Sequence, residues 1–224
     1  MLEINKVYNM DCLEGLKLLP DKSIDLILTD PPYSIGYKSN RGKKEYKERI
    51  QKTDWDKDFD FSLYFNEFWR VLKDNSWFYV FGRWENFETM KKLGFKKILI
   101  WNKQHTGMGD LTCWGIAYEL IFVFKKGKPI IRGKRPEGVI NIQHISFFDK
   151  TIHPTQKPVK LLRYIINKSS DEGNIVLDGF SGSGSCLIAS KQLNRNYMGF
   201  EISGEYCDLI KNQLKQQTLK GVCN

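Results

Sequence analysis

Short apolar runs rich in β-branched residues alternate with segments of helical periodicity along most of the chain. Such alternation predicts an α/β fold, with a mostly parallel sheet covered by helices on both faces. We expect strands at 4–8, 24–28, 76–81, 95–101, 117–124, 175–180 and 197–202, and helices at 13–19, 59–72, 85–93, 159–166 and 186–193. The 224 residues, 41% of them hydrophobic, suffice for one core, so we expect a single domain over residues 1–224.

The charge balance points toward a polyanionic partner. Lysine and arginine outnumber aspartate and glutamate by 35 to 26, a net charge of +9, which suits nucleic acid without establishing it. The five cysteines are scattered and none has metal-ligand spacing, so we expect neither a disulfide framework nor a metal site. No apolar run is long enough to span a membrane and the start lacks signal-peptide features, which predicts a cytoplasmic protein.

The apolar run at 24–28 leads into the motif Asp30-Pro31-Pro32-Tyr33. Pro32 has no N–H, so the carbonyl of Pro31 is free to accept a hydrogen bond from outside the chain, and Asp30 supplies a second acceptor. Two such acceptors suit both hydrogens of one exocyclic amino group, and the face of Tyr33 suits the ring that carries it. The alternative is a strand-end turn with a packed tyrosine.

A second motif has the layout of a nucleoside-cofactor site. The strand expected at 175–180, which contains Asp178, is followed by a glycine-rich turn at 181–185, a helix, and Glu201 at the end of the next strand. Backbone N–H groups of such a turn approach a cofactor closely, and the later carboxylate accepts from ribose hydroxyls. The turn lacks both Gly-x-Gly-x-x-Gly and a P-loop lysine, which disfavours nicotinamide and ATP. A nucleoside cofactor without a pyrophosphate fits better.

Three other segments carry functional expectations. Asp11 lies at a strand-to-helix junction, where it is either a ligand contact or a helix N-cap. A basic, polar stretch predicts a mobile loop at about 36–57 that contacts nucleic acid. Residues 103–152 lose regular periodicity around the strand at 117–124, and we expect them to form a target-recognition insertion, with Arg132 among the residues that grip the partner.

The order of these motifs resembles the β-group amino methyltransferases of bacterial DNA. The resemblance rests on Asp30-Pro-Pro-Tyr33, His153-Pro-Thr-Gln-Lys-Pro158 and Asp178-Gly-Phe-Ser-Gly-Ser-Gly184, and it spans nearly the whole chain. It implies a Rossmann-like class I methyltransferase fold with a mostly parallel seven-stranded sheet, in a permuted order that puts the catalytic half before the cofactor half. It further implies transfer of a methyl group from S-adenosylmethionine to adenine N6 or cytosine N4 of a base flipped out of double-stranded DNA. Aspartate at the first motif position goes mainly with adenine in that family.

The resemblance also assigns roles to individual residues. It implies catalytic roles for Asp30, Pro31, Pro32 and Tyr33. It implies cofactor contacts for Asp11 and Cys12 near the adenine, Glu201 at the ribose, Lys157 at the methionine end, and Asp30, Asp178, Phe180, Gly182, Ser183, Gly184 and Ser185 along the remainder. Relatives often pair, so the resemblance allows a homodimer.

The chain departs from the family pattern at two positions. The family usually has proline where this chain has Gly179, and often threonine where it has Ser185; neither change removes a functional group. No Pro-Cys pair is present, which disfavours carbon-5 methylation of cytosine through a thiolate. The remaining alternatives are a cytosine-N4 enzyme, an RNA or protein-amide N-methyltransferase, and an inactive nucleic-acid-binding relative.

Overall fold

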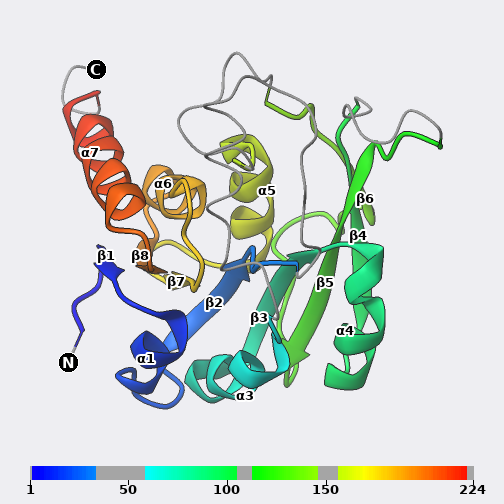
Figure 1. The fold of residues 1–224 in the computed structure, drawn as a ribbon, viewed down its shortest axis with the longest axis horizontal. Helices are drawn as coiled ribbons and strands as arrows, with labels where there is room; N and C mark the ends of the chain where they lie inside the picture. The colour runs from blue at the N-terminus through cyan, green and yellow to red at the C-terminus, as the bar shows by residue number, and fades with distance from the viewer. Residues whose placement is uncertain (1, 34–58, 105–112, 146–155, 221–224) are drawn as a thin grey trace.

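A mixed eight-stranded sheet forms the centre of the molecule (Figure 1). The structure is a computed structural model and describes residues 2–33, 59–104, 113–145 and 156–220. The strand order is β1-β8-β7-β2-β3-β5-β4-β6, and only the pairs that β5 makes with β3 and β4 are antiparallel. The strands are β1 (Lys6–Asn9), β2 (Ile24–Thr29), β3 (Leu72–Gly82), β4 (Lys97–Asn102), β5 (Tyr118–Lys126), β6 (Val139–Asn141), β7 (Ile175–Asp178) and β8 (Asn196–Glu201).

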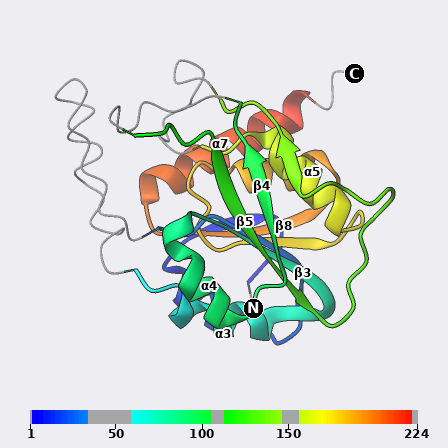
Figure 2. The ribbon, with the colours of Figure 1, turned by 90° about the vertical axis from the view of Figure 1, so that its right-hand side faces the viewer.

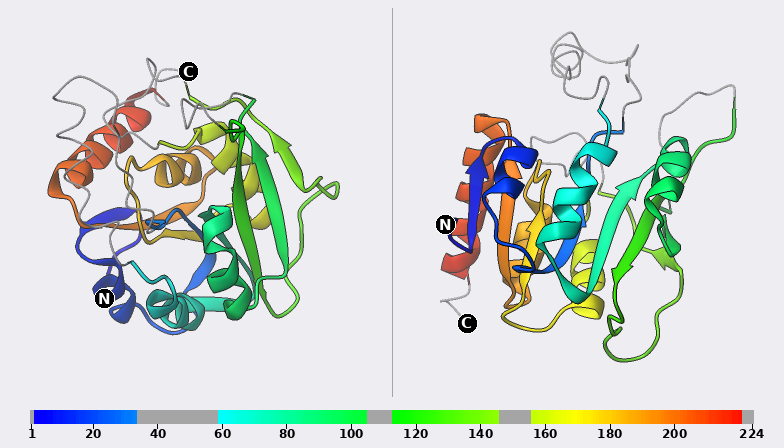
Figure 3. Two further views of the ribbon diagram at one scale, coloured as in Figure 1. Left: turned by 45° about the vertical axis from the view of Figure 1, so that its right-hand side comes forward. Right: turned by 90° about the horizontal axis from the view of Figure 1, so that it is seen from below.

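Helices cover both faces of this sheet (Figures 1 and 3). One face carries α1 (Cys12–Lys17), α3 (Ser62–Val71) and α4 (Phe87–Leu93), and the other carries α5 (Val159–Ser169), α6 (Ser185–Gln192) and α7 (Gly204–Lys220). The short 3-10 helix η2 (Trp84–Asn86) precedes α4. None of the helices in the described ranges is long and apolar enough to cross a membrane.

Alternation along β3 explains why both faces are apolar. Phe78 and Val80 belong to the core under α3, whereas Tyr79 and Phe81 belong to the core under α5. Successive side chains of a strand point to opposite faces, so one buried strand supplies both cores. The helix α3 covers the first of these cores with Phe65 and Phe68, which are buried in it.

The sequence pattern predicted the strands but not all of their neighbours. The strand–helix–strand unit formed by β3, α4 and β4 is present, yet β5 lies between the two strands and is antiparallel to both (Figure 2). The sheet also has one strand more than expected, because the three-residue β6 extends it beside β4 within a segment that shows no periodicity. The C-terminal helix α7 was not anticipated either.

Two predicted segments are described by the structure only in part or not at all. The loop expected at about 36–57 lies outside the described residues, as do parts of the range 103–152. The described part of that range contains β5 and β6, so much of it belongs to the sheet.

The carboxyl ends of four adjacent parallel strands form one rim. The order β1-β8-β7-β2 brings Glu201, Asp178 and Asp30 next to one another at or just after the ends of their strands, and Asp11 follows β1. Open α/β sheets bind ligands at this edge. The Asp30 motif and the Asp178 loop therefore meet at one edge of one sheet.

Candidate active site

A cluster of buried charged groups stands directly behind the Asp30 motif. Lys157 Nζ lies 2.6 Å from Asp30 Oδ2 and 2.9 Å from Glu119 Oε1. The Tyr33 hydroxyl is hydrogen-bonded to Asp30 Oδ1, and it is 2.7 Å from Glu119 Oε1. The side chains of Lys157 and Glu119 are 8% and 9% exposed. The cluster therefore joins the end of β2, the start of β5 and the segment before α5.

Burial and mutual attraction set the ionisation of this cluster. Burial raises the pKa of Asp30; Lys157 opposes this shift and Glu119 adds to it. Burial also opposes ionisation of Glu119, but the nearby lysines hold the pKa of that carboxyl at about 2. Although burial disfavours its charge, Lys157 has a raised pKa because both carboxylates attract it. Asp30 is thus a carboxylate whose charge is balanced by a buried ammonium group.

The turn that follows Asp30 lines a cavity of about 300 Å³. The side chain of Asn86 supports the turn, since its Nδ2 donates to the Tyr33 carbonyl at 3.3 Å. Besides these residues, the cavity is lined by aromatic and polar side chains that include Phe59, Asp60, Phe61, Phe81, Glu85 and Thr89. Proline, tyrosine and phenylalanine surfaces with a few polar groups suit a flat heterocyclic ring.

The Asp178 loop is tied to both neighbouring strands. Asp178 is 5% exposed, and its Oδ1 accepts from Thr29 Oγ1 at 2.9 Å and from the Phe180 N–H at 3.2 Å. Burial raises the pKa of Asp178 to about 7, although both hydrogen bonds act in the opposite direction. This carboxyl thereby connects β7 to β2 and shapes the start of the loop.

Glu201 orders the same loop from β8. Its Oε2 accepts from the Gly182 N–H at 2.7 Å and its Oε1 accepts from the Ser203 N–H at 2.9 Å. Burial raises the pKa of Glu201, and the backbone hydrogen bonds oppose that shift. Within the loop, Ser183 and Ser185 are buried, and their hydroxyl oxygens are hydrogen-bonded at 3.0 Å. Gly182 and Gly184 have φ of 49° and 77°, a region that glycine adopts without strain.

Of the two roles expected for Asp11, ligand contact or helix N-cap, the structure shows the N-cap. Its carboxylate accepts from the Leu13 N–H at 2.8 Å and the Glu14 N–H at 3.3 Å, so the expected N-cap is confirmed. The neighbouring Cys12 is 4% exposed, and burial raises the pKa of its thiol. Contact of either residue with a cofactor stays a prediction.

Gly179 and Phe180 show how the loop fits α3. A Cβ atom at Gly179 would lie 2.4 Å from Phe68 Cζ and 2.7 Å from Cys12 Sγ, so the ring of Phe68 occupies the space that a larger residue would need. Phe180 packs against Phe59, with ring centroids 5.4 Å apart. Glycine at this position is therefore a packing requirement of this chain.

Sequence reasoning missed two residues of the charged cluster and one residue of β2 that holds Asp178. Glu119 was overlooked, together with Lys103, whose Nζ lies 3.0 Å from Glu119 Oε2, and Thr29. A signal for Glu119 was present, because it is the one charged residue in the apolar run 117–124. A buried charge in such a strand requires a partner of opposite charge.

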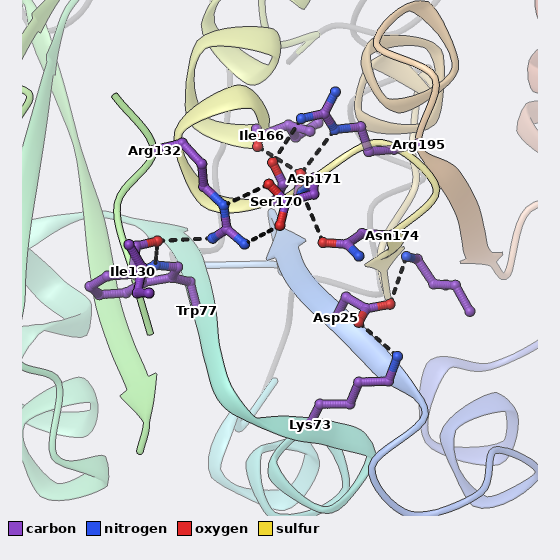
Figure 4. Close-up of polar contacts among 11 residues, drawn as sticks. Asp25, Lys73, Trp77, Ile130, Arg132, Ile166, Ser170, Asp171, Asn174 and Arg195 are labelled. Carbon is purple, nitrogen blue, oxygen red and sulfur yellow. Dashed lines mark hydrogen bonds and ion pairs between the residues drawn. The ribbon is translucent and has the colours of Figure 1, made fainter. Parts of the chain in front are cut away.

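A second hollow lies at the opposite edge of the sheet, where the parallel strands begin (Figure 4). Arg132 donates to both carboxylate oxygens of Asp171, at 3.1 Å and 2.6 Å. Arg195 donates to the Ser170 carbonyl at 2.7 Å, and Lys73 pairs with Asp25 at 2.7 Å. The guanidinium of Arg132 joins the segment after β5 to the α5–β7 turn. Contact of Arg132 with a partner stays a prediction.

Comparison with known proteins places the chain in a family. A family model described as DNA methylase matches residues 24–212. The type II methyltransferase M2.MboI of Moraxella bovis is 30% identical over 96% of this chain and 93% of that protein. These matches confirm the family that the motifs resemble.

Two solved structures share the fold. The PvuII DNA methyltransferase, described as cytosine-N4-specific, has a TM-score of 0.72 and 19% identity, covering 93% of this chain and 89% of that one. The complex of M1.HpyAVI with S-adenosylmethionine has a TM-score of 0.68 and 24% identity, covering 93% and 98%. The predicted class I methyltransferase fold is confirmed. This chain belongs to the S-adenosylmethionine-dependent DNA methylases that modify adenine N6 or cytosine N4.

Proposed function

We propose that the protein transfers a methyl group from S-adenosylmethionine to the exocyclic N6 of adenine in double-stranded DNA. The observation that carries the proposal is the position of Asp30, an acceptor beside the cavity lined by Pro31, Pro32 and Tyr33. Family membership supports DNA as the substrate class. The fold does not distinguish adenine from cytosine, because the PvuII methyltransferase that shares it is described as cytosine-N4-specific. The preference for adenine therefore rests on aspartate at the first position of the motif.

The rim has the donor and acceptor chemistry that the methyl donor needs. When bound, S-adenosylmethionine supplies an electrophilic methyl group on a positively charged sulfur. Carboxylates of Asp30, Asp178 and Glu201 lie near one another there, as their mutual influence on the pKa of Asp178 indicates. An acidic rim favours a sulfonium cation, and Glu201 stands at the strand end where ribose hydroxyls are bound in related sheets.

Asp30 and the Pro31 carbonyl activate the target amine in this proposal. The lone pair of an exocyclic amine is delocalised into the ring, which makes the nitrogen a weak nucleophile. Acceptors on both N–H bonds favour a pyramidal nitrogen and stabilise the positive charge that develops on it. The lysine beside Asp30 keeps the carboxylate charged in its buried position. The nitrogen attacks the methyl group directly, so no covalent intermediate with the protein is required: the methyl–sulfur bond breaks to leave a neutral thioether, and the extra proton on the nitrogen passes to Asp30 or to solvent.

The cavity receives the flipped base. Extrusion from the duplex costs a few kcal/mol, and stacking on Tyr33 together with hydrogen bonds to the motif offsets that cost. DNA recognition is assigned to the part of 103–152 at the same rim as Asp30. Lys103 and Ala117 are joined there by a backbone hydrogen bond of 2.7 Å, and Trp114 between them is 95% exposed.

One experiment separates the proposed activity from its alternatives. The purified protein is incubated with unmethylated duplex DNA and methyl-labelled S-adenosylmethionine, and the DNA is digested to nucleosides for chromatography. Label in N6-methyldeoxyadenosine is the expected result, and the Asp30→Ala variant serves as the control that should lose it. Label in N4-methyldeoxycytidine would overturn the choice of base alone. Label only in RNA or protein supplied in parallel would overturn DNA as the substrate.

A further inference from the structure

Glu119 stands behind Asp30 as a second carboxylate with the same partners. It projects from the start of β5, a strand that contributes none of the motifs recognised in the sequence. Its Oε1 lies 2.9 Å from Lys157 Nζ and 2.7 Å from the Tyr33 hydroxyl, and both of these groups also contact Asp30. The cluster therefore has two carboxylates that compete for the same donors.

The direction of the Tyr33 hydroxyl proton determines which of the two carboxylates accepts its hydrogen bond. The Tyr33 hydroxyl is within hydrogen-bond distance of both carboxylates but carries a single proton, so it donates to one of them at a time. Lys157 already occupies Asp30 Oδ2. When the phenol proton is directed to Glu119, Oδ1 of Asp30 is left open to accept from another donor.

A second lysine holds Glu119 in place. Lys103 Nζ lies 3.0 Å from Glu119 Oε2 and 5.4 Å from the ring centroid of Trp101, a buried residue whose Nε1 donates to the Ile142 carbonyl at 2.7 Å. Two carboxylates thus face two lysines, so the buried charges balance. Asp30 also acts on Asp178 of the neighbouring strand β7, because its charge raises the pKa of that carboxyl.

We propose that Glu119 is a positioning residue for methyl transfer: it takes the hydrogen bonds of Tyr33 and shares Lys157, so that one oxygen of Asp30 stays open to the target amine. This inference rests on the proposed function. Glu119 touches neither the amine nor the methyl donor and acts through Tyr33 and Lys157.

The Glu119→Gln variant tests this role. The glutamine keeps the size of the side chain and an acceptor oxygen, but the phenol proton now prefers the charged Asp30 over a neutral amide. Turnover is expected to fall by about tenfold to a hundredfold, because a small misplacement of a reacting group has effects of that size. The KM for DNA and the cofactor dissociation constant, measured by calorimetry, should stay within about twofold of the wild type. Glu172→Gln, an exposed carboxylate at the opposite edge of the sheet, is the control.

The pH profile provides a readout that a structural role would not move. The negative charge of Glu119 raises the pKa of Asp30, so its removal should shift the acid limb of turnover to lower pH. Glu119→Asp keeps the charge and should leave that limb in place while turnover still falls. If the glutamine variant does not fold, the turnover of Glu119→Asp tests the proposal in its place. Loss of folded structure in both variants, seen by circular dichroism, would assign Glu119 to stability and overturn the proposal.

A double-mutant cycle completes the test. If Glu119 acts by taking the phenol proton, then Glu119→Gln should have little further effect in a Tyr33→Phe background, which keeps the ring and lacks the proton. Additive effects of the two changes, or wild-type turnover in Glu119→Gln, would overturn the role of Glu119 and leave the methyltransferase assignment standing. Absence of methyl transfer by the wild-type protein itself would overturn the proposed function instead.

Discussion

The hydroxyl of Thr29 donates to Oδ1 of Asp178 at 2.9 Å and so joins the ends of two strands that lie 149 positions apart in the chain. Both residues are almost fully buried, Thr29 at 1% exposed and Asp178 at 5%. This contact sits between the Asp30 motif, which follows Thr29, and the glycine-rich loop, which follows Asp178. It holds the two halves of the proposed site at one rim.

Removal of this hydrogen bond should destabilise the fold. Thr29→Val keeps the shape of the side chain but leaves a lone pair of a buried carboxyl without its donor. We expect the free energy of unfolding to fall by about 1 to 3 kcal/mol. Urea denaturation followed by circular dichroism measures it, and Thr29→Ser, which retains the hydroxyl, is the control. An unchanged midpoint in the valine variant would show that the contact adds nothing to stability.

Asp178 should make stability depend on pH. Its pKa is raised to about 7 in the folded protein from an ordinary value of 3.8. Between these values the folded chain retains the proton and the unfolded chain has released it, so this contribution to stability is lost as the pH rises from about 4 to about 7. Asp178→Asn, which keeps an acceptor oxygen and does not titrate, should gain on the order of 4 kcal/mol relative to the wild type over that range. Parallel denaturation curves of the two proteins at pH 5 and pH 8 compare them, and a constant difference would contradict the shift.

Replacement of Asp30 should impair catalysis more than binding. In Asp30→Ala the amine loses a charged acceptor, and we expect a loss of about 2 to 4 kcal/mol of transition-state stabilisation, read from kcat/KM. The fold should persist because Lys157 keeps Glu119 as a partner at 2.9 Å. Calorimetric titration with S-adenosylmethionine should show near-normal affinity. Normal turnover in this variant would remove Asp30 from the mechanism.

Glu201 should affect the cofactor instead. Glu201→Ala removes the proposed acceptor for ribose hydroxyls. It also removes the hydrogen bond that the Gly182 N–H donates to this carboxylate at 2.7 Å. Both changes weaken the site, and we expect the dissociation constant of S-adenosylmethionine to rise by about tenfold or more, equivalent to about 1.4 kcal/mol. Calorimetry measures the constant, and Glu205→Ala at the exposed start of α7 is the matched control. Equal affinities of the two variants would contradict the role.

The space at Gly179 should tolerate no side chain. Gly179→Ala places a Cβ within 2.4 Å of the ring of Phe68, and overpacking of this kind costs about 1 to 3 kcal/mol. Thermal unfolding of Gly179→Ala, Phe68→Leu and the double variant tests the cause. The alanine should be less harmful when the ring is gone, and equal effects of Gly179→Ala in both backgrounds would exclude the clash.

The two motifs and most of the strands and helices were predictable from the sequence, because turn chemistry and periodicity are local properties of neighbouring residues. The family was predictable from the resemblance of the motifs and their order. The same reasoning could not choose between a ligand contact and a helix cap for Asp11, and the structure shows that it caps α1. It did not reveal the contact of Arg132 with Asp171, since the sign of a charge does not show which of several distant carboxylates it will meet.

Local pattern by itself determined where the buried strands lie to within about two residues, and hence that Asp30, Asp178 and Glu201 stand near strand ends. Tertiary structure alone decided that β5 enters the sheet antiparallel between β3 and β4 and brings Glu119 to Lys157. The physical reason is that an apolar strand can pair with several partners of equal hydrophobicity. The choice among them depends on packing and charge balance across the whole sheet.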